Sequence, residues 1–522
     1  MSLASSSLAS SSLASSSASS SLASSSRHDP DAAALAIPGR DEGPLVPLVV
    51  DLDGTLLRTD LLLEGVVAIL RRNVLMLFSM LVWLPRGRAY FKRRVAERAA
   101  LDFATLPANE ELLAYIELQK TLGREIVLAT AADALMARGI VERFPLFDRA
   151  VSSDGLVNLK GEVKAQALAT LFPRGFDYAG NAAVDLPIWA RAQRVILVET
   201  PASVARAARA GGRPSEEFAA APRLRALAKG LRLHQWAKNG LVFVPLVLGG
   251  LAGSAGAWGE AALAFLALGL VASASYLLND LWDLPHDRAH WSKRHRPLAS
   301  GRLPLATGLA ATLGGLALGL SLAAAGGPAL LAAVLAYLTV TLAYSFSLKR
   351  VPMLDALILG GLFTLRLVIG VAAVGVAWSP WLLTFSMFLF TSLSFAKRHT
   401  ELRGAAKRGR TGQISGRGYR PADEPVVLAF GVAAGLASIV IFILYLANEA
   451  FRHAVLSAPL ALWTFPLVLV LFMGRIWLLA GRDELNDDPV AFAVKDRPSL
   501  SLAAIAGLSF AVAAFGLPGW GG

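Results

Sequence analysis

Long apolar runs separated by short polar segments fill the chain from about residue 240 to residue 520. A helix needs about 20 apolar residues to cross a bilayer. We therefore predict an all-helical membrane domain at 225–522 with about nine spans, at residues 239–257, 260–280, 304–324, 328–346, 354–376, 380–396, 425–447, 456–479 and 500–518. Residues 41–215 are typical of a soluble domain. Residues 1–40 open with Leu-Ala-Ser-Ser-Ser repeats, which predict a disordered low-complexity tail.

Lys and Arg gather in the loops that follow the second, fourth, sixth and eighth predicted spans. By the positive-inside rule, this alternation places those loops and the N-terminal domain in the cytoplasm. The net charge of +12 is therefore interpreted as membrane topology and binding of anionic substrates, not as nucleic-acid binding. The chain has no cysteine, which excludes disulfides, iron–sulfur clusters, cysteine zinc sites and thiol nucleophiles.

One further apolar stretch, Val74–Pro85, lies inside the soluble domain. It is too short to cross a bilayer, and Arg71 and Arg72 precede it. We expect a helix that covers the soluble domain and is suited to lie on a membrane surface.

Acidic residues mark the end of the second predicted span. Asp280, Asp283 and Asp287 follow Asn279 at helical spacings, which place three carboxylates on one stripe. Pro285 interrupts this stripe and is expected to kink or restart the helix. Hard oxygen ligands suit Mg²⁺ bound to a phosphorylated substrate. Because carboxylates at a membrane boundary are costly to keep, the stripe predicts a functional site.

Cations accompany the stripe. Lys293, Arg294 and Arg296 follow it in the same loop. With Mg²⁺ between the carboxylates and the substrate, these cations can hold a diphosphate leaving group and neutralise its developing charge. Arg366 lies inside the fifth predicted span, where an arginine usually faces a polar cavity, so it is a further candidate phosphate ligand.

The segment Asn279-Asp280-x-x-Asp283-x-x-x-Asp287 resembles the first aspartate-rich motif of the UbiA superfamily of membrane prenyltransferases. The resemblance covers about residues 225–520. It implies an all-helical fold with a cavity open to the cytoplasm and to the lipid. It also implies that Asp280, Asp283 and Asp287 hold Mg²⁺ on a diphosphate, which Asn279 helps to orient.

The chain departs from the family after the sixth predicted span. Many members carry a second aspartate pair there, whereas this chain has Lys397 and Arg398. A second Mg²⁺ is therefore doubtful. The two cations either contact phosphate directly or serve only as topogenic positive charges.

Three other segments resemble the polyprenyl-phosphate phosphoribosyltransferase branch of that superfamily: 231–239, 290–297 and 344–349. They add Lys238, Tyr344 and Lys349 to the candidate substrate-binding residues. The resemblance implies transfer of phosphoribose from phosphoribosyl diphosphate to a polyprenyl phosphate, with Mg²⁺ as cofactor. Two alternatives stay open: transfer of a polyprenyl group to an aromatic or tetrapyrrole acceptor, and a lipid or solute transporter with a regulatory domain. The predicted location is a prokaryotic cell membrane.

The soluble domain contains a buried apolar strand at 48–50 followed at once by Asp51-x-Asp53-Gly-Thr. With Thr130, Lys164 and Asp185 further along, this order resembles the haloacid-dehalogenase-like phosphatases and implies an α/β domain with a Rossmann-like sheet.

The resemblance implies the role of each residue in that site. Asp51 would be the nucleophile, and Asp53 the acid and base. Thr130 and Lys164 would bind the phosphoryl group. Mg²⁺ would be held by Asp185 with Asp51 and a backbone carbonyl, in a metal site that also includes Asp53. Asn181 replaces the aspartate of the common pattern, so an active phosphatase and a scaffold remain alternatives.

Overall fold

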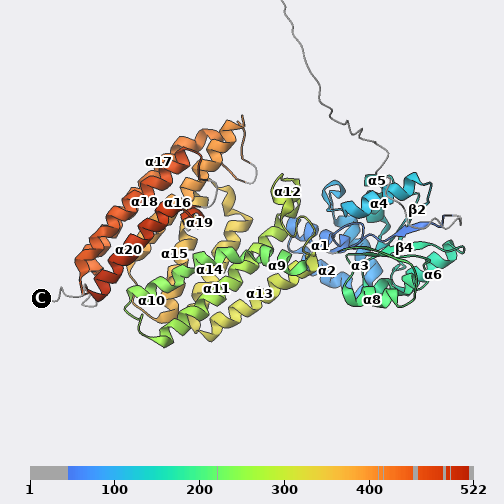
Figure 1. Cartoon of the computed structure of the whole chain (residues 1–522), viewed down its shortest axis with the longest axis horizontal. Helices are drawn as coiled ribbons and strands as arrows, with labels where there is room; N and C mark the ends of the chain where they lie inside the picture. Colours follow the sequence, from blue (N-terminus) through green and yellow to red (C-terminus); the bar gives the residue numbers. More distant parts are fainter. Residues whose placement is uncertain are drawn as a thin grey trace, which may run out of the picture. The chain divides into compact units, whose positions relative to one another are not determined.

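A computed structural model describes residues 45–219, 222–409, 411–414, 417–450, 457–485, 489–493 and 495–516. The predicted tail at 1–40 lies outside these residues. Within them the chain forms a parallel sheet with its helices at 46–218 and a set of long helices from residue 223 onward (Figure 1).

The soluble domain is built on a six-stranded parallel sheet of order β3-β2-β1-β4-β5-β6. Its strands are β1 (Leu48–Val50), β2 (Ile126–Asp133), β3 (Arg149–Ser153), β4 (Asp177–Gly180), β5 (Val195–Val198) and β6 (Ser215–Phe218). Successive side chains of a strand point to opposite faces. Leu48 and Val50 accordingly join one apolar core, while Val49 joins the other.

Helices cover both faces of this sheet (Figure 1). They are α4 (Glu110–Thr121), α5 (Ala134–Arg143), α6 (Glu162–Leu171), α7 (Leu186–Trp189) and α8 (Ala202–Arg209). An insertion between β1 and β2 adds three more: α1 (Leu61–Arg72), α2 (Met76–Trp83) and α3 (Arg88–Arg98). The predicted α/β architecture is therefore present, with its open loops at the carboxyl ends of the strands.

The second half of the chain is helical. Its elements are α9 (Arg223–Leu231), the 3-10 helix η4 (Leu233–Phe243), α10 (Val244–Leu248), α11 (Ala255–Trp282), α12 (Leu284–Ala289), α13 (Leu305–Ala325), α14 (Pro328–Phe346), the 3-10 helix η6 (Leu348–Arg350), α15 (Leu354–Val374), α16 (Pro380–Lys407), α17 (Glu424–Tyr445), α18 (Thr464–Gly481), α19 (Pro489–Ala493) and α20 (Arg497–Phe515). Helices α11, α14 and α15 share one apolar core, which includes Leu268, Val334 and Ile369.

Seven helices within the described ranges are long and apolar enough to cross a membrane: α11, α13, α14, α15, α17, α18 and α20, where α17 and α18 include short extensions. The sixth predicted span lies in α16, which has 28 residues but carries Lys397, Arg398 and His399 in its second half. Nine spanning helices are therefore not confirmed.

The first predicted span, 239–257, differs most from expectation. It is not one helix, because η4 runs into the five-residue helix α10 and the chain then turns at Gly249 and Gly250. Proline at the start of α10 cannot donate a backbone hydrogen bond. Gly370 lets this segment approach α15 closely, since a Cβ atom there would lie 2.2 Å from the Val242 carbonyl oxygen.

Candidate functional site

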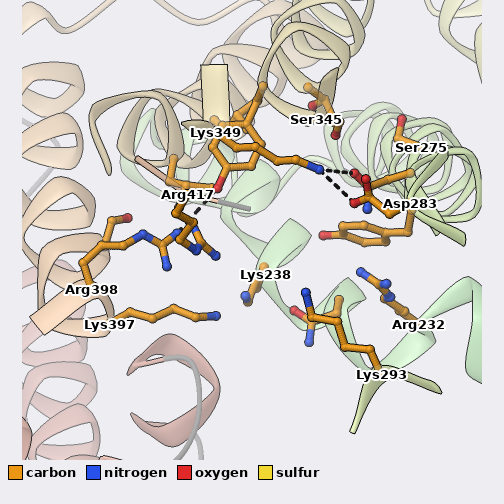
Figure 2. Close-up of a pocket in the computed structure, with 18 of the residues that line it drawn as sticks. Arg232, Lys238, Ser275, Asp283, Lys293, Ser345, Lys349, Lys397, Arg398 and Arg417 are labelled. Atoms are coloured by element: carbon orange, nitrogen blue, oxygen red, sulfur yellow. Dashed lines mark hydrogen bonds and ion pairs between the residues drawn. The ribbon is translucent and has the colours of Figure 1, made fainter. Parts of the chain in front are cut away.

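A cavity of about 890 Å³ lies among the helices of the membrane domain (Figure 2). Its walls come from the carboxyl ends of α11 and α14, from α12 and the loop after it, from η6, and from the middle of α15 and α16. Aromatic and small polar side chains line the wall between these ends, including Tyr276, Tyr344 and Ser345. Polar and charged groups thus converge on one space large enough for two small substrates.

The acidic stripe ends up at one edge of this cavity. Asp283 is the C-cap of α11, and its backbone N–H donates to the Asn279 carbonyl oxygen. Asp287 lies one turn later in α12, because Pro285 starts a new helix. Asn279, Asp283 and Asp287 line the cavity, whereas Asp280 is buried and is not among the lining residues.

Each of the three carboxylates is paired with a cation. Asp280 accepts hydrogen bonds from Arg232 Nη2 at 2.6 Å and from Arg296 Nη1 at 3.0 Å. The same Arg296 nitrogen lies 2.7 Å from Asp287 Oδ2. Asp283 is therefore the carboxylate that stands apart from Arg296, and it has a lysine partner of its own.

That partner comes from η6. Lys349 Nζ donates to Asp283 Oδ2 at 2.8 Å and to Asn279 Oδ1 at 3.4 Å. Dashed lines in Figure 2 mark these two contacts. Lys349 thus contacts two of the motif residues that line the cavity.

A preformed metal site is not present in the part of the chain that the structure describes: no three His, Cys, Asp or Glu side chains are close enough to hold an ion. The chemistry of the donor set nevertheless fits Mg²⁺, because carboxylate and amide oxygens are its usual ligands. Arg296 occupies the space between Asp280 and Asp287, so its guanidinium holds the position of a shared cation.

Burial shifts the pKa values of two charged side chains at this edge of the cavity. Burial raises the pKa of the Asp287 carboxyl, and the neighbouring Asp280 raises it further, although Arg296 opposes both effects. Burial also lowers the pKa of Lys293, which lines the cavity. Removing both groups from water makes each more responsive to an incoming charge of opposite sign.

Of the other cations that the sequence predicted for the membrane domain, all but one line the cavity. Arg294 does not line the cavity, and its Nε lies 3.4 Å from His295 Nε2. Arg294 shares the 3-10 turn Lys293–His295 with Lys293, which does line the cavity, and its predicted role in substrate binding stays a prediction. Lys238, Lys293, Arg296, Arg366, Lys397 and Arg398 all line the cavity, as does Tyr344.

Arg366 is held firmly inside the wall. Its guanidinium donates to Asn239 Oδ1 at 3.1 Å, to the Leu362 carbonyl oxygen and to the Tyr337 hydroxyl. It also lies 5.0 Å from the centroid of the Phe363 ring. Because its hydrogen bonds go to protein groups, Arg366 shapes the cavity and adds a fixed positive charge to it.

A second charged group faces the cavity from α16. Arg398 Nε donates to Asp355 Oδ2 at 2.6 Å, and its Nη1 donates to Glu401 at 2.8 Å. The Tyr419 hydroxyl donates to the other Asp355 oxygen at 2.6 Å. The guanidinium of Arg417 lies 3.4 Å from the carboxylate of Asp355 and 3.3 Å from that of Glu401.

This second group replaces the aspartate pair that the family resemblance leads one to expect. Arg417 and Arg232 both line the cavity, and the sequence interpretation did not include them among the site residues. Arg232 could have been found from its place just before the first apolar run. Arg417 carries no such signal, because it lies in a polar loop rich in arginine.

The soluble domain has its own pocket, of about 300 Å³, at the carboxyl ends of its strands. Asp51 follows β1 directly, and its Oδ1 accepts a hydrogen bond from Lys164 Nζ at 2.6 Å. Lys164 also donates to the Tyr178 hydroxyl, which donates to Asp185 Oδ1. The backbone N–H groups of Asn181 and Ala182 both donate to the second Asp185 oxygen at 3.0 Å.

Two carboxyl groups of this pocket have raised pKa values. Burial, assisted by the charges of Asp60 and Asp51, raises the pKa of Asp53 to about 8. Burial and the charge of Asp51 raise the pKa of Asp185 to about 6. A carboxyl that keeps its proton near neutral pH is suited to give a proton to a leaving group.

One predicted residue of this pocket lies apart from it, and one residue of the pocket network was not predicted. Thr130 is fully buried, does not line the pocket, and its hydroxyl accepts a hydrogen bond from the Ala132 N–H. This hydrogen bond lies within β2, and the predicted phosphoryl-binding role of Thr130 stays a prediction. Tyr178, which the sequence did not single out, connects Lys164 to Asp185.

Comparison with known proteins bears mainly on the membrane domain. Residues 242–496 match the model of the UbiA prenyltransferase family. The protein y4nM of Sinorhizobium fredii is 41% identical over 472 residues, which cover 90% of this chain and 91% of that protein. Nodulation protein NoeC of Azorhizobium caulinodans is 33% identical, over 55% of this chain and 92% of the relative.

A third relative is named as an enzyme. Decaprenyl-phosphate phosphoribosyltransferase of Mycolicibacterium smegmatis is 36% identical over 35% of this chain and 59% of its own length. Among solved structures, a UbiA homolog from Archaeoglobus fulgidus bound to DMAPP and Mg²⁺ is 17% identical, over 55% of this chain and 96% of that chain, at a TM-score of 0.43.

The helices of the second half are long and apolar enough for a membrane, and the family match lies within them. The Sinorhizobium fredii relative, which matches over 90% of this chain, extends over these helices as well. The chain is therefore an integral membrane protein whose helical domain belongs to the UbiA prenyltransferase family.

Proposed function

We propose that the membrane domain transfers phosphoribose from phosphoribosyl diphosphate to a polyprenyl phosphate. One observation carries this proposal: two separate groups of cations face each other across a single cavity. Figure 2 shows Lys349, Arg232 and Lys293 on one side, Lys397, Arg398 and Arg417 on the other, and Lys238 between them. A reaction between two phosphorylated substrates needs two such anion sites, whereas a neutral acceptor needs one.

The acidic edge suits the diphosphate donor. Asn279, Asp280, Asp283 and Asp287 would hold Mg²⁺, which when bound neutralises charge on the departing diphosphate. Lys349 and Arg296 now occupy these carboxylates. When a diphosphate binds, the side chains of Lys349 and Arg296 can exchange their carboxylate partners for phosphate oxygens. Each cation then still has an anionic partner.

The α16 side suits the acceptor phosphate. Arg398 is held in place by Asp355 and Glu401, while Arg417 and Lys397 line the cavity beside it. An oxygen of the acceptor phosphate forms a bond to C1 of the ribose, and the bond from C1 to the diphosphate breaks with its electron pair leaving on the diphosphate. The acceptor is already an anion, so the step requires no strong base.

The decaprenyl-phosphate phosphoribosyltransferase names of several relatives support this choice of donor and acceptor, at 29–36% identity over about a third of the chain. The alternation of basic loops supports a cytoplasmic position for the cavity mouth and for the N-terminal domain.

The test uses purified protein with Mg²⁺ and a bacterial lipid extract. Radioactive label supplied in the ribose of phosphoribosyl diphosphate should move into the lipid fraction, and label supplied in a polyprenyl diphosphate should not join an aromatic acceptor. Label that moves only from the polyprenyl diphosphate would show prenyl transfer instead. Uptake of either compound into vesicles without conversion would show a transporter.

For the soluble domain we propose a phosphatase of the haloacid-dehalogenase type. Asp51 at the end of the central strand would attack phosphorus, displacing an alkoxide that takes the proton of Asp53. Lys164 supports this reading because it neutralises Asp51 at 2.6 Å, where a phosphoryl oxygen would also meet it. The carboxylates of Asp51 and Asp185, together with a backbone carbonyl oxygen, would hold Mg²⁺, which supplies charge neutralisation when bound.

A further inference from the structure

Helix α2, in the insertion of the soluble domain, has an apolar outer face. Its inner face packs on the domain core through Met80 and Trp83. The outer face consists of large apolar side chains that are 46–69% exposed: Leu75, Leu77, Phe78, Leu81, Val82 and Leu84. A helix on the surface of a soluble domain normally turns polar residues outward, so an apolar outer face indicates a binding surface.

The segments that flank α2 are strongly basic. Between Glu64 and Glu97 the chain has no Asp or Glu and seven Lys or Arg. Arg71 and Arg72 end α1 just before α2, and Arg86 follows it. Arg98 of α3 lies 4.9 Å from the ring centroid of Trp83, which places another positive charge beside the base of α2.

We propose that α2 lies in the surface of the membrane that the helical domain spans, with its outer face among the acyl chains. The flanking arginines would contact anionic lipid headgroups. An apolar strip bordered by basic residues is the pattern of interfacial helices, and the exposed Arg72, Arg86 and Arg88 suit an anionic leaflet. The same chain carries seven described helices that are long and apolar enough to cross a membrane, so a bilayer is part of its surroundings.

A second copy of the chain fits the face less well. A helix of eight residues is about 12 Å long, so one side of it falls far short of the roughly 800 Å² per partner that a stable protein interface buries. The basic border would also repel the same border on another copy. A membrane imposes neither requirement, because insertion needs only a small apolar area and benefits from each basic residue.

The lack of cysteine makes a direct test possible, since one introduced cysteine is the only thiol in the chain. Full-length Phe78→Cys and Leu81→Cys are each labelled with an environment-sensitive fluorophore and reconstituted into vesicles of phosphatidylcholine and phosphatidylglycerol. The matched control is Leu118→Cys, at a 50% exposed leucine of α4 in the same domain. Lipids with a spin label on the acyl chain serve as quenchers.

We expect the spin-labelled lipids to quench positions 78 and 81 several-fold more than position 118. We also expect the difference to shrink when phosphatidylglycerol is replaced by phosphatidylcholine. Equal quenching at the three positions would overturn the proposal. A blue-shifted emission at position 78 without quenching by lipid would overturn it as well, because it would show that protein covers the face. Quenching that does not depend on anionic lipid would refute the role of the arginines.

Discussion

Lys349 Nζ lies 2.8 Å from Asp283 Oδ2, although 66 residues separate the two side chains in the sequence. The pair joins the short 3-10 turn η6 to the end of α11 and lies at the cavity wall. Both side chains are about one-fifth exposed, so the pair is open to an incoming ligand. A lysine in this position can pass from the carboxylate to a phosphate when a donor enters with its metal.

Replacing Lys349 with glutamine should weaken binding of the diphosphate donor. The variant loses one positive charge at the donor side, so the KM for phosphoribosyl diphosphate should rise about tenfold or more, with a smaller change for the acceptor. Steady-state transfer assays with each substrate varied in turn measure this. The control is Arg302→Gln, at an exposed cation that does not line the cavity. An equal effect in both variants would contradict the assignment.

Asp283→Asn should reduce transfer about 100-fold or more, because a neutral amide cannot hold a divalent cation as a carboxylate does. The remaining activity should need a higher Mg²⁺ concentration for half-saturation. The matched control is Glu260→Gln, at an exposed carboxylate near the other end of the same helix. A variant that loses activity with an unchanged Mg²⁺ dependence would argue against a metal role for Asp283.

Asp355→Asn should destabilise the membrane domain. Asp355 is completely buried and accepts hydrogen bonds from Arg398 and Tyr419. Removing one partner of a buried pair typically costs about 3–5 kcal/mol. Glu401 still neutralises part of the Arg398 charge, which places the loss near the lower end.

The comparison for this prediction is Tyr419→Phe. It removes one hydrogen bond to the same carboxylate and should cost only about 1 kcal/mol. Thermal unfolding of both variants in one detergent gives the order of the two losses. Equal melting temperatures for the two variants would mean that the carboxylate is not the anchor of this group.

Asp51→Asn should abolish phosphate release by the soluble domain and leave lipid labelling by the membrane domain unchanged. The amide keeps the size of the side chain but is not a nucleophile toward phosphorus. Phosphate release from small phosphate esters by the full-length protein measures the first effect. Asp154→Asn, in an exposed loop, is the control. Release that persists in Asp51→Asn would show that this domain is not the phosphatase.

Sequence patterns correctly predicted the strands and helix ends that a short segment determines by itself. The apolar strand predicted before Asp51 is β1. The position of Asn279 and its aspartates at the end of a long helix also agrees with expectation. These features depend on side-chain period and on turn residues, which a short segment determines by itself.

Contacts between distant segments could not be predicted in the same way. Nothing local indicates that Arg296 bridges two carboxylates, or that Asp355 takes Arg398 and Tyr419 as partners. Hydropathy likewise predicted one spanning helix at 239–257, where the chain forms two short helical pieces. An apolar run by itself does not reveal such a break. Which of several neighbouring cations faces a cavity is decided by tertiary packing.

The central claim is that one cavity binds two phosphorylated substrates at separate cationic sides. The most direct measurement is the pair of KM values, for phosphoribosyl diphosphate and for polyprenyl phosphate, in Arg417→Gln. Arg417 lines the cavity on the α16 side. We expect the KM for polyprenyl phosphate to rise about tenfold and the KM for the donor to change less than about twofold. A rise in the donor KM alone, or equal rises in both, would contradict it.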